Sequence, residues 1–124
     1  MSKKNNKRTG YYGEDIAMNY LISKGYTILE RNFLSEYGEI DIIAKEKNTL
    51  VFVEVKCRKT NDFGYPLEAV DTKKIKKIIV VLENYLKSKK KSQKNHKNFR
   101  IDAIGINLKD SIPVEIKHIE NISI

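Results

Sequence analysis

Three charged residues lie inside two stretches that otherwise have the apolar character of central β-strands. Asp41 lies in G-E-I-D-I-I-A at Gly38–Ala44, and Glu54 and Lys56 lie in F-V-E-V-K at Phe52–Lys56. Burying a charge alone is costly, so charges in such strands are expected to be paired, metal-bound or functional. Two carboxylates on neighbouring strands could hold Mg²⁺, which binds carboxylates, a backbone carbonyl, waters and substrate phosphate.

Alternation along the second stretch places Glu54 and Lys56 on one face with Phe52, about 6.5–7 Å apart. Beside two carboxylates, the charged form of Lys56 is favoured. With a metal bound, Lys56 could position or deprotonate a water, or stabilise charge on a phosphate. Simple pairing of Lys56 with Glu54 is the alternative.

Alternation also predicts the faces of the remaining strand residues. One face of the second stretch carries the valines at 51, 53 and 55. In the first stretch, Glu39, Asp41 and Ile43 are expected on one face, with Ile40, Ile42 and Ala44 on the other.

The elements around these stretches follow from hydrophobic periodicity and turn residues. A helix with an apolar face ends at Gly25, a helix-terminating residue, and Glu14 lies in its first turn, where negative charge suits the helix dipole. Asp71 is a candidate N-cap for a second helix. Helices are expected at about 10–24 and 72–86, and strands at about 26–33, 39–45, 50–58, 100–107 and 112–119.

Composition and charge bound the class of protein. The 124 residues suit one domain, preceded by a flexible basic arm over residues 1–9. A net charge of +8 suggests a polyanionic partner such as nucleic acid, although a merely lysine-rich soluble surface is an alternative. Cys57 is the only cysteine, which excludes an intrachain disulfide and fits the cytoplasm. No apolar run reaches the ~20 residues of a membrane span.

The spacing D-x12-E-x-K across two apolar strands, after a helix with an early Glu, resembles the PD-(D/E)XK nuclease superfamily. More closely, the chain resembles the bacterial YraN family of predicted endonucleases, distantly similar to archaeal Holliday junction resolvases. The motifs that carry the resemblance are G-E-D-I-A-M-N-Y-L at Gly13–Leu21, G-Y-T-I-L-E-R-N at Gly25–Asn32, G-E-I-D-I-I-A at Gly38–Ala44, F-V-E-V-K-C-R at Phe52–Arg58, P-L-E-A-V at Pro66–Val70 and R-I-D-A-I at Arg100–Ile104.

The resemblance implies an α/β, restriction-endonuclease-like αβββαβ core over residues 10–124, with a mixed central sheet flanked by helices. It implies that Asp41 and Glu54 bind Mg²⁺ or Mn²⁺ and that Lys56 is the catalytic lysine. Glu14 matches an acid that the resolvase branch carries on its first helix. Ile40 replaces the proline of the name-giving motif, which leaves the neighbouring carboxylate in place.

Two functions follow as expectations. The first is a metal-dependent endonuclease acting on DNA, with branched or junction DNA as the implied substrate and a homodimer as the implied assembly. The second is a non-catalytic nucleic-acid-binding module with the same fold. Phosphate contacts are predicted for Arg58 and for Lys73, Lys74 and Lys77 on the second helix, and a surface salt bridge is the alternative for Arg58. Cys57 is predicted to be a packed thiol, and His96 and His118 lack metal-ligand spacing.

Overall fold

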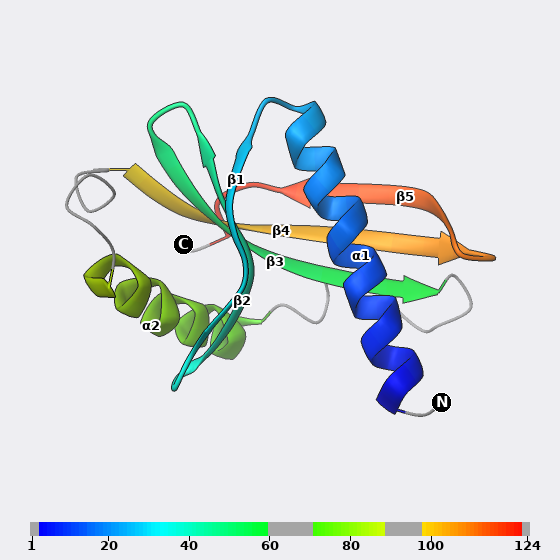
Figure 1. Cartoon of the computed structure of the whole chain (residues 1–124), viewed down its shortest axis with the longest axis horizontal. Coiled ribbons are helices and arrows are strands. Elements are labelled where there is room, and N and C mark those ends of the chain that lie inside the picture. Colours follow the sequence, from blue (N-terminus) through cyan, green and yellow to red (C-terminus); the bar gives the residue numbers. More distant parts are fainter. Residues whose placement is uncertain (1–2, 60–70, 89–97, 123–124) are drawn as a thin grey trace.

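The computed structural model describes residues 3–59, 71–88 and 98–122, which form one five-stranded sheet and two helices (Figure 1). The elements are α1 (Lys3–Ser23), β1 (Thr27–Ser35), β2 (Gly38–Glu46), β3 (Thr49–Lys59), α2 (Thr72–Ser88), β4 (Asn98–Lys109) and β5 (Ile112–Ile119). The predicted α/β class and mixed sheet are confirmed. The strand predicted at 112–119 is present as β5, which follows the αβββαβ core.

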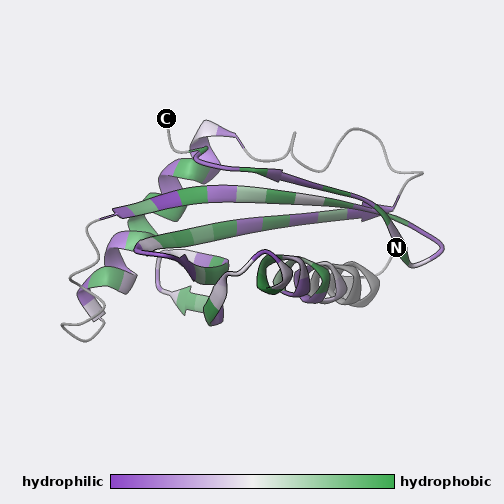
Figure 2. Cartoon of the chain, turned by 90° about the horizontal axis from the view of Figure 1, so that it is seen from above, coloured by the Kyte–Doolittle hydropathy of each residue, from purple (hydrophilic) through white to green (hydrophobic). Residues whose placement is uncertain are grey.

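The strands lie in sequence order, and only β3 and β4 are parallel among neighbouring pairs. A parallel pair needs a long crossover connection, and α2 lies within this one. In the view from above, apolar residues run along the long strands, and α1 lies against one face (Figure 2). The two helices are therefore the covers that a largely apolar sheet requires.

Alternation along β3 separates two apolar clusters. The α1-side core contains Ala17, Leu21, Ile42, Ala44, Val51, Val53, Ile104 and Ile106. The α2-side core contains Ile40, Ile43, Leu50, Phe52, Ile78, Val81, Leu82, Tyr85 and Ile101. The predicted division of Phe52 from the three valines is confirmed, because Val55 also packs on the α1 side.

The helix ends agree with the predicted signals except at the N-terminus of α1. Gly25 has φ +93°, the conformation in which glycine follows a helix. The Lys74 N–H donates to Asp71 Oδ1 at 2.9 Å, which confirms the N-cap of α2. Helix α1 begins at Lys3 rather than at Gly10, where the sequence predicted an arm up to Thr9. Once the packed turns are formed, each added residue gains a hydrogen bond, so the helix can extend.

One predicted face in β2 is wrong. Ile40 packs in the α2-side core with Ile43, whereas Ile42 packs on the opposite side. The pairing of β2 with β3 begins only at Ile42, so the strand bends away from its partner around Asp41 and the alternation is interrupted.

Helix α1 crosses β3 closely at Gly13. A Cβ atom at Gly13 would lie 2.5 Å from Cys57 Cβ and 3.0 Å from its Sγ. Since Cys57 packs against the α1-side core, it lies on the side opposite Glu54 and Lys56, as predicted, and burial raises the pKa of its thiol to about 11. Glycine is therefore required here by space rather than by backbone conformation.

We expect Gly13→Ala to destabilise the fold by about 1–3 kcal/mol through overpacking against Cys57. Elsewhere in a helix interior the same change stabilises by up to about 1 kcal/mol. Urea unfolding measures the difference, with Asn19→Ala at an exposed position of α1 as the control. A Gly13→Ala variant as stable as the wild type would contradict this close packing.

Several sequence expectations lie outside the described residues. These are the motif P-L-E-A-V at Pro66–Val70 and His96. Within the described part, neither helix is long and apolar enough to cross a membrane.

Candidate metal centre

The charged site lies where β2 separates from β3. The last paired residues of the two strands toward this end are Ile42 and Val53. Beyond them, the Val55 N–H donates to Asp41 Oδ2 at 2.8 Å. The Asp41 carboxylate thus accepts a backbone hydrogen bond at the point where the ladder ends, which fixes one of its oxygens.

Carboxylates from two elements meet at this point. One oxygen from each of Glu14, Glu39 and Asp41 lies within 4.8 Å of the others. Glu14 comes from α1 and is only 9% exposed, while Glu39 and Asp41 come from β2. The predicted proximity of Glu14 to Asp41 is therefore present. We call these three residues the acidic cluster.

Two β1 residues hold the acidic cluster together. Asn32 Nδ2 donates to Glu14 Oε1 at 2.8 Å and to Glu39 Oε1 at 2.9 Å. Arg31 Nε lies 3.4 Å from Glu14 Oε1. Asn32 has φ +54°, a conformation that asparagine tolerates better than most residues. It lies between residues paired with Ile42 and Ile40, and hence across from Asp41.

Arg31 and Asn32 were not among the site residues predicted from the sequence, and Glu39 had no predicted role. All three are polar residues in or beside strands, a pattern that solvent-exposed strand faces share. The motif G-Y-T-I-L-E-R-N at Gly25–Asn32 contains Arg31 and Asn32 and was the available signal.

Glu54, the other predicted metal ligand, is not among the three carboxylates that meet within 4.8 Å of one another; its charge acts on Asp41, and it is paired with lysines. It is 4% exposed, and its Oε1 lies 3.3 Å from Lys56 Nζ and 3.6 Å from Lys74 Nζ. The Glu54–Lys56 pair is the alternative foreseen from the sequence. Lys74 reaches the same carboxylate from α2, which explains one of the basic residues crowding the first turns of that helix.

The pKa of Asp41 is raised, because the carboxyl is buried among other acidic side chains. Burial raises the pKa of Asp41 to about 7, and the charges of Glu54, Glu14 and Glu39 add to this, while the Val55 N–H opposes it. Oxygen donors within 4.8 Å of one another could hold a divalent cation, which would displace the proton of Asp41 and offset the neighbouring negative charges. The donor set fits a hard metal ion.

The other predicted phosphate contacts lie on two elements. Lys73 and Lys77 are exposed on α2, and Arg58 is half-buried near the end of β3. Their contacts with DNA stay predictions.

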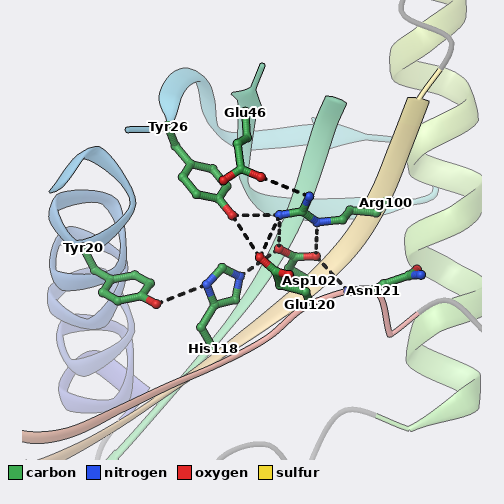
Figure 3. A network of polar contacts seen from close by, with 8 residues as sticks. All are labelled: Tyr20, Tyr26, Glu46, Arg100, Asp102, His118, Glu120 and Asn121. Carbon is green, nitrogen blue, oxygen red and sulfur yellow. Dashed lines mark hydrogen bonds and ion pairs between the residues drawn. The ribbon is translucent and has the colours of Figure 1, made fainter. Parts of the chain in front are cut away.

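A second polar cluster surrounds Asp102 on β4 (Figure 3). Asp102 is fully buried and accepts hydrogen bonds from Arg100 Nε at 3.0 Å and from the Asn121 N–H at 3.0 Å. Its other oxygen lies 2.8 Å from His118 Nε2. Arg100 also meets Glu46, Tyr26 and Glu120. We call Asp102 and these partners the Asp102 network.

His118, for which the sequence showed no metal-ligand spacing, belongs to the Asp102 network. Oxygens of Asp102 and Glu120 and a nitrogen of His118 lie within 4.8 Å of one another, a spacing that could suit a metal. However, Arg100 already supplies a cation to both carboxylates, and His118 Nδ1 lies 3.3 Å from the Tyr20 hydroxyl. We therefore interpret the network as structural, joining α1, β4 and the end of β5.

Comparison with known proteins places the chain among bacterial relatives. The model of the family described as "Uncharacterised protein family UPF0102" matches residues 13–106. A UPF0102 protein of Clostridioides difficile is 47% identical over 117 residues, covering 94% of this chain and 97% of that protein. UPF0102 proteins of Caldanaerobacter subterraneus (44%; 98% of each chain) and Persephonella marina (45%; 90% of each) are also similar. The matched region includes the acidic cluster and the Glu54 pair.

Proposed function

The chain belongs to the UPF0102 family, the YraN family, and from its acidic cluster we propose that it is a metal-dependent endonuclease hydrolysing DNA phosphodiesters. The observation that carries the proposal is the Asp41 carboxylate, fixed by the Val55 N–H among further acids, with lysines beside them. A protein that only binds phosphate has little use for inward-facing carboxylates, because they repel it. A site that holds a cation needs them.

The residues divide into roles in this proposal. Asp41 and Glu54 hold Mg²⁺ or Mn²⁺, and Glu14 orients a water at the edge of the site. The metal, when bound, supplies Lewis-acid stabilisation of the phosphate and lowers the pKa of water. Lys56, whose Nζ lies 3.3 Å from Glu54 Oε1, stabilises charge on the scissile phosphate or orients the water in this proposal.

The DNA contact is proposed for the basic residues beside this site. Lys73 and Lys77 are exposed on α2, the helix whose Lys74 reaches Glu54. Arg58 follows Lys56 on β3 and is the further candidate. Branched or junction DNA is the proposed substrate, and the cytoplasm is the proposed place of action.

Nuclease activity is tested with the purified chain on junction, flap and single-stranded DNA, with Mg²⁺ or Mn²⁺ and with EDTA in place of metal. We expect cleavage products only with metal. Absence of products on every substrate, or equal cleavage in EDTA, would refute the proposal.

A non-catalytic nucleic-acid-binding module is the second candidate, favoured by the exposed lysines of α2. It predicts DNA binding in EDTA that weakens steeply with salt, because phosphate contacts release counterions. Binding of this kind without any metal-dependent product would identify the module.

We expect Lys74→Gln to tighten Mn²⁺ binding by about 5-fold, because an opposing charge about 4 Å from a ligand is worth roughly 1 kcal/mol in water. Lys74 Nζ lies 3.6 Å from Glu54 Oε1 and competes with a cation for it. Calorimetric titration with Mn²⁺ measures the change, with Lys73→Gln as the matched control on the exposed side. If Lys74→Gln and Lys73→Gln bound Mn²⁺ with equal affinity, Glu54 would not be a ligand of the metal.

A further inference from the structure

We propose that β5 is an interaction edge at which a second copy of the chain pairs antiparallel, extending the sheet across a two-fold axis at Ile116. Strand β5 is the last strand in the sheet order. Its apolar side chains are open to solvent, with Ile112 62%, Val114 55% and Ile116 38% exposed. An edge strand with exposed apolar residues is a template for pairing with another strand. The proposal does not depend on nuclease activity.

The opposite edge of the sheet is less suited to pairing. Strand β1 is irregular between Ile28 and Glu30, and Asn32 has a positive φ. Such irregularities are devices that keep edges from pairing. Moreover, Arg31 and Asn32 are engaged with the acidic cluster. Strand β5 is regular from Glu115 to Ile119 in its pairing with β4.

One hydrogen bond fixes which backbone groups of β5 face outward. The Ile122 N–H donates to the Ile101 carbonyl at 2.7 Å, so the odd-numbered residues of β4 turn their backbone groups toward β5. Gly105 pairs with Lys117, and Lys117 therefore directs its N–H and C=O to β4. The backbone groups of Ile116 and His118 consequently point to the outer edge, where a further strand can bond to them.

The side chains select one register. In antiparallel pairing centred on Ile116, the Ile116 residues of the two copies lie opposite each other. Glu115 of each copy then lies opposite Lys117 of the other copy, which gives two charge pairs. Opposite charges across a strand pair are stabilising. Asn107 Nδ2 donates to Glu115 Oε1 at 2.9 Å and holds that carboxylate on the sheet surface. Pairing centred on Val114 would instead place Glu115 opposite Pro113, without an opposing charge. Charge complementarity therefore points to a second copy as the occupant and to Ile116 as the centre.

Charge exchange in sedimentation experiments tests this interface. We expect the metal-free wild type to approach twice the 14.4 kDa mass of one chain as its concentration rises. Glu115→Lys and Lys117→Glu each place like charges opposite one another, and each should raise the dimer dissociation constant by about 5- to 30-fold. The double variant restores both pairs and should restore the dimer. Circular dichroism of each variant verifies that it is folded.

Cross-linking locates the two-fold axis. Ile116→Cys should form a disulfide-linked dimer under mild oxidation, because a hydrogen-bonded antiparallel pair has Cα atoms about 5.5 Å apart. Val80→Cys, at an exposed position of α2, is the matched control and should form no disulfide-linked dimer. A wild type that stays at 14.4 kDa at every concentration would overturn the proposal, as would charge variants that dimerise as well as the wild type. Linkage of Val80→Cys as fast as Ile116→Cys would also overturn it.

Discussion

Asp41→Asn is expected to lower metal-dependent DNA cleavage by more than about 100-fold, since even outer-shell partners of metal ligands contribute about 10–100-fold. The same substitution is expected to stabilise the metal-free protein above neutral pH. Asparagine can still accept the Val55 N–H with its carbonyl oxygen. Its NH2 group can also donate a hydrogen bond to a neighbouring carboxylate of the acidic cluster, whereas the ionised side chain of Asp41 has no proton to donate.

The pH dependence of this stabilisation has a definite sign. The pKa of Asp41 is raised to about 7 in the folded protein, above its unfolded value. Folding therefore takes up a proton between about pH 4 and pH 7, and wild-type stability falls as pH rises through this window. The advantage of Asp41→Asn should grow over the same window and level off above it. Its upper bound is about 4 kcal/mol, at roughly 1.4 kcal/mol per pKa unit.

Urea unfolding in EDTA from pH 4 to pH 9 measures the stability, and cleavage of junction DNA with Mn²⁺ measures the activity. The control is Asp15→Asn, an exposed carboxylate of α1 that pairs with Arg31. It should change activity little and stability by no more than about 1 kcal/mol. An Asp41→Asn variant that cleaves normally would exclude Asp41 as a metal ligand. If Asp41→Asn were less stable than the wild type at pH 8, the charged Asp41 carboxylate would not destabilise the metal-free protein, and the prediction would be wrong.

The parts of the site that depend on local order could be predicted from the sequence. Glu54 and Lys56 share a face because β3 is regular, and alternation is a property of neighbouring residues. The caps at Gly25 and Asp71 are likewise set within a few residues. The general order of helices and strands followed from the same local patterns.

The parts that depend on distant contacts or irregular backbone could not be predicted. The positive φ of Asn32 and the separation of β2 from β3 at Asp41 interrupt alternation, so Ile40 was assigned to the wrong face. Lys74 meets Glu54 only after α2 has packed on the sheet. His118 meets Asp102 through the pairing of β5 with β4, which no local spacing encodes.

Asp102→Ala is expected to destabilise the fold by about 3–5 kcal/mol, because it removes the buried partner of an ion pair and leaves Arg100, among the described carboxylates, with only the more exposed Glu46 and Glu120. Asp102 is fully buried and receives hydrogen bonds from Arg100, His118 and the Asn121 N–H. Domain stabilities are typically about 5–15 kcal/mol, so this loss is a large share of the total. It should loosen the chain after β5, where the bond from the Asn121 N–H is lost and the bond from the Ile122 N–H to the Ile101 carbonyl remains.

Glu120→Ala is the matched control, because Glu120 pairs with the same Arg100 but its side chain is 59% exposed. A pair of this kind contributes about 0–1 kcal/mol, so the control should unfold near the wild-type urea midpoint. Burial alone would raise the pKa of Asp102, but the hydrogen bonds from His118, Arg100 and Asn121 hold it below its usual value. The stabilisation by Asp102 is therefore present above its unfolded pKa of about 3.9 and is lost as pH falls through the folded pKa. If Asp102→Ala and Glu120→Ala lowered the free energy of unfolding by the same large amount, burial of Asp102 would not be the source of the stabilisation. If both lowered it only slightly, the Asp102 network would have no structural role.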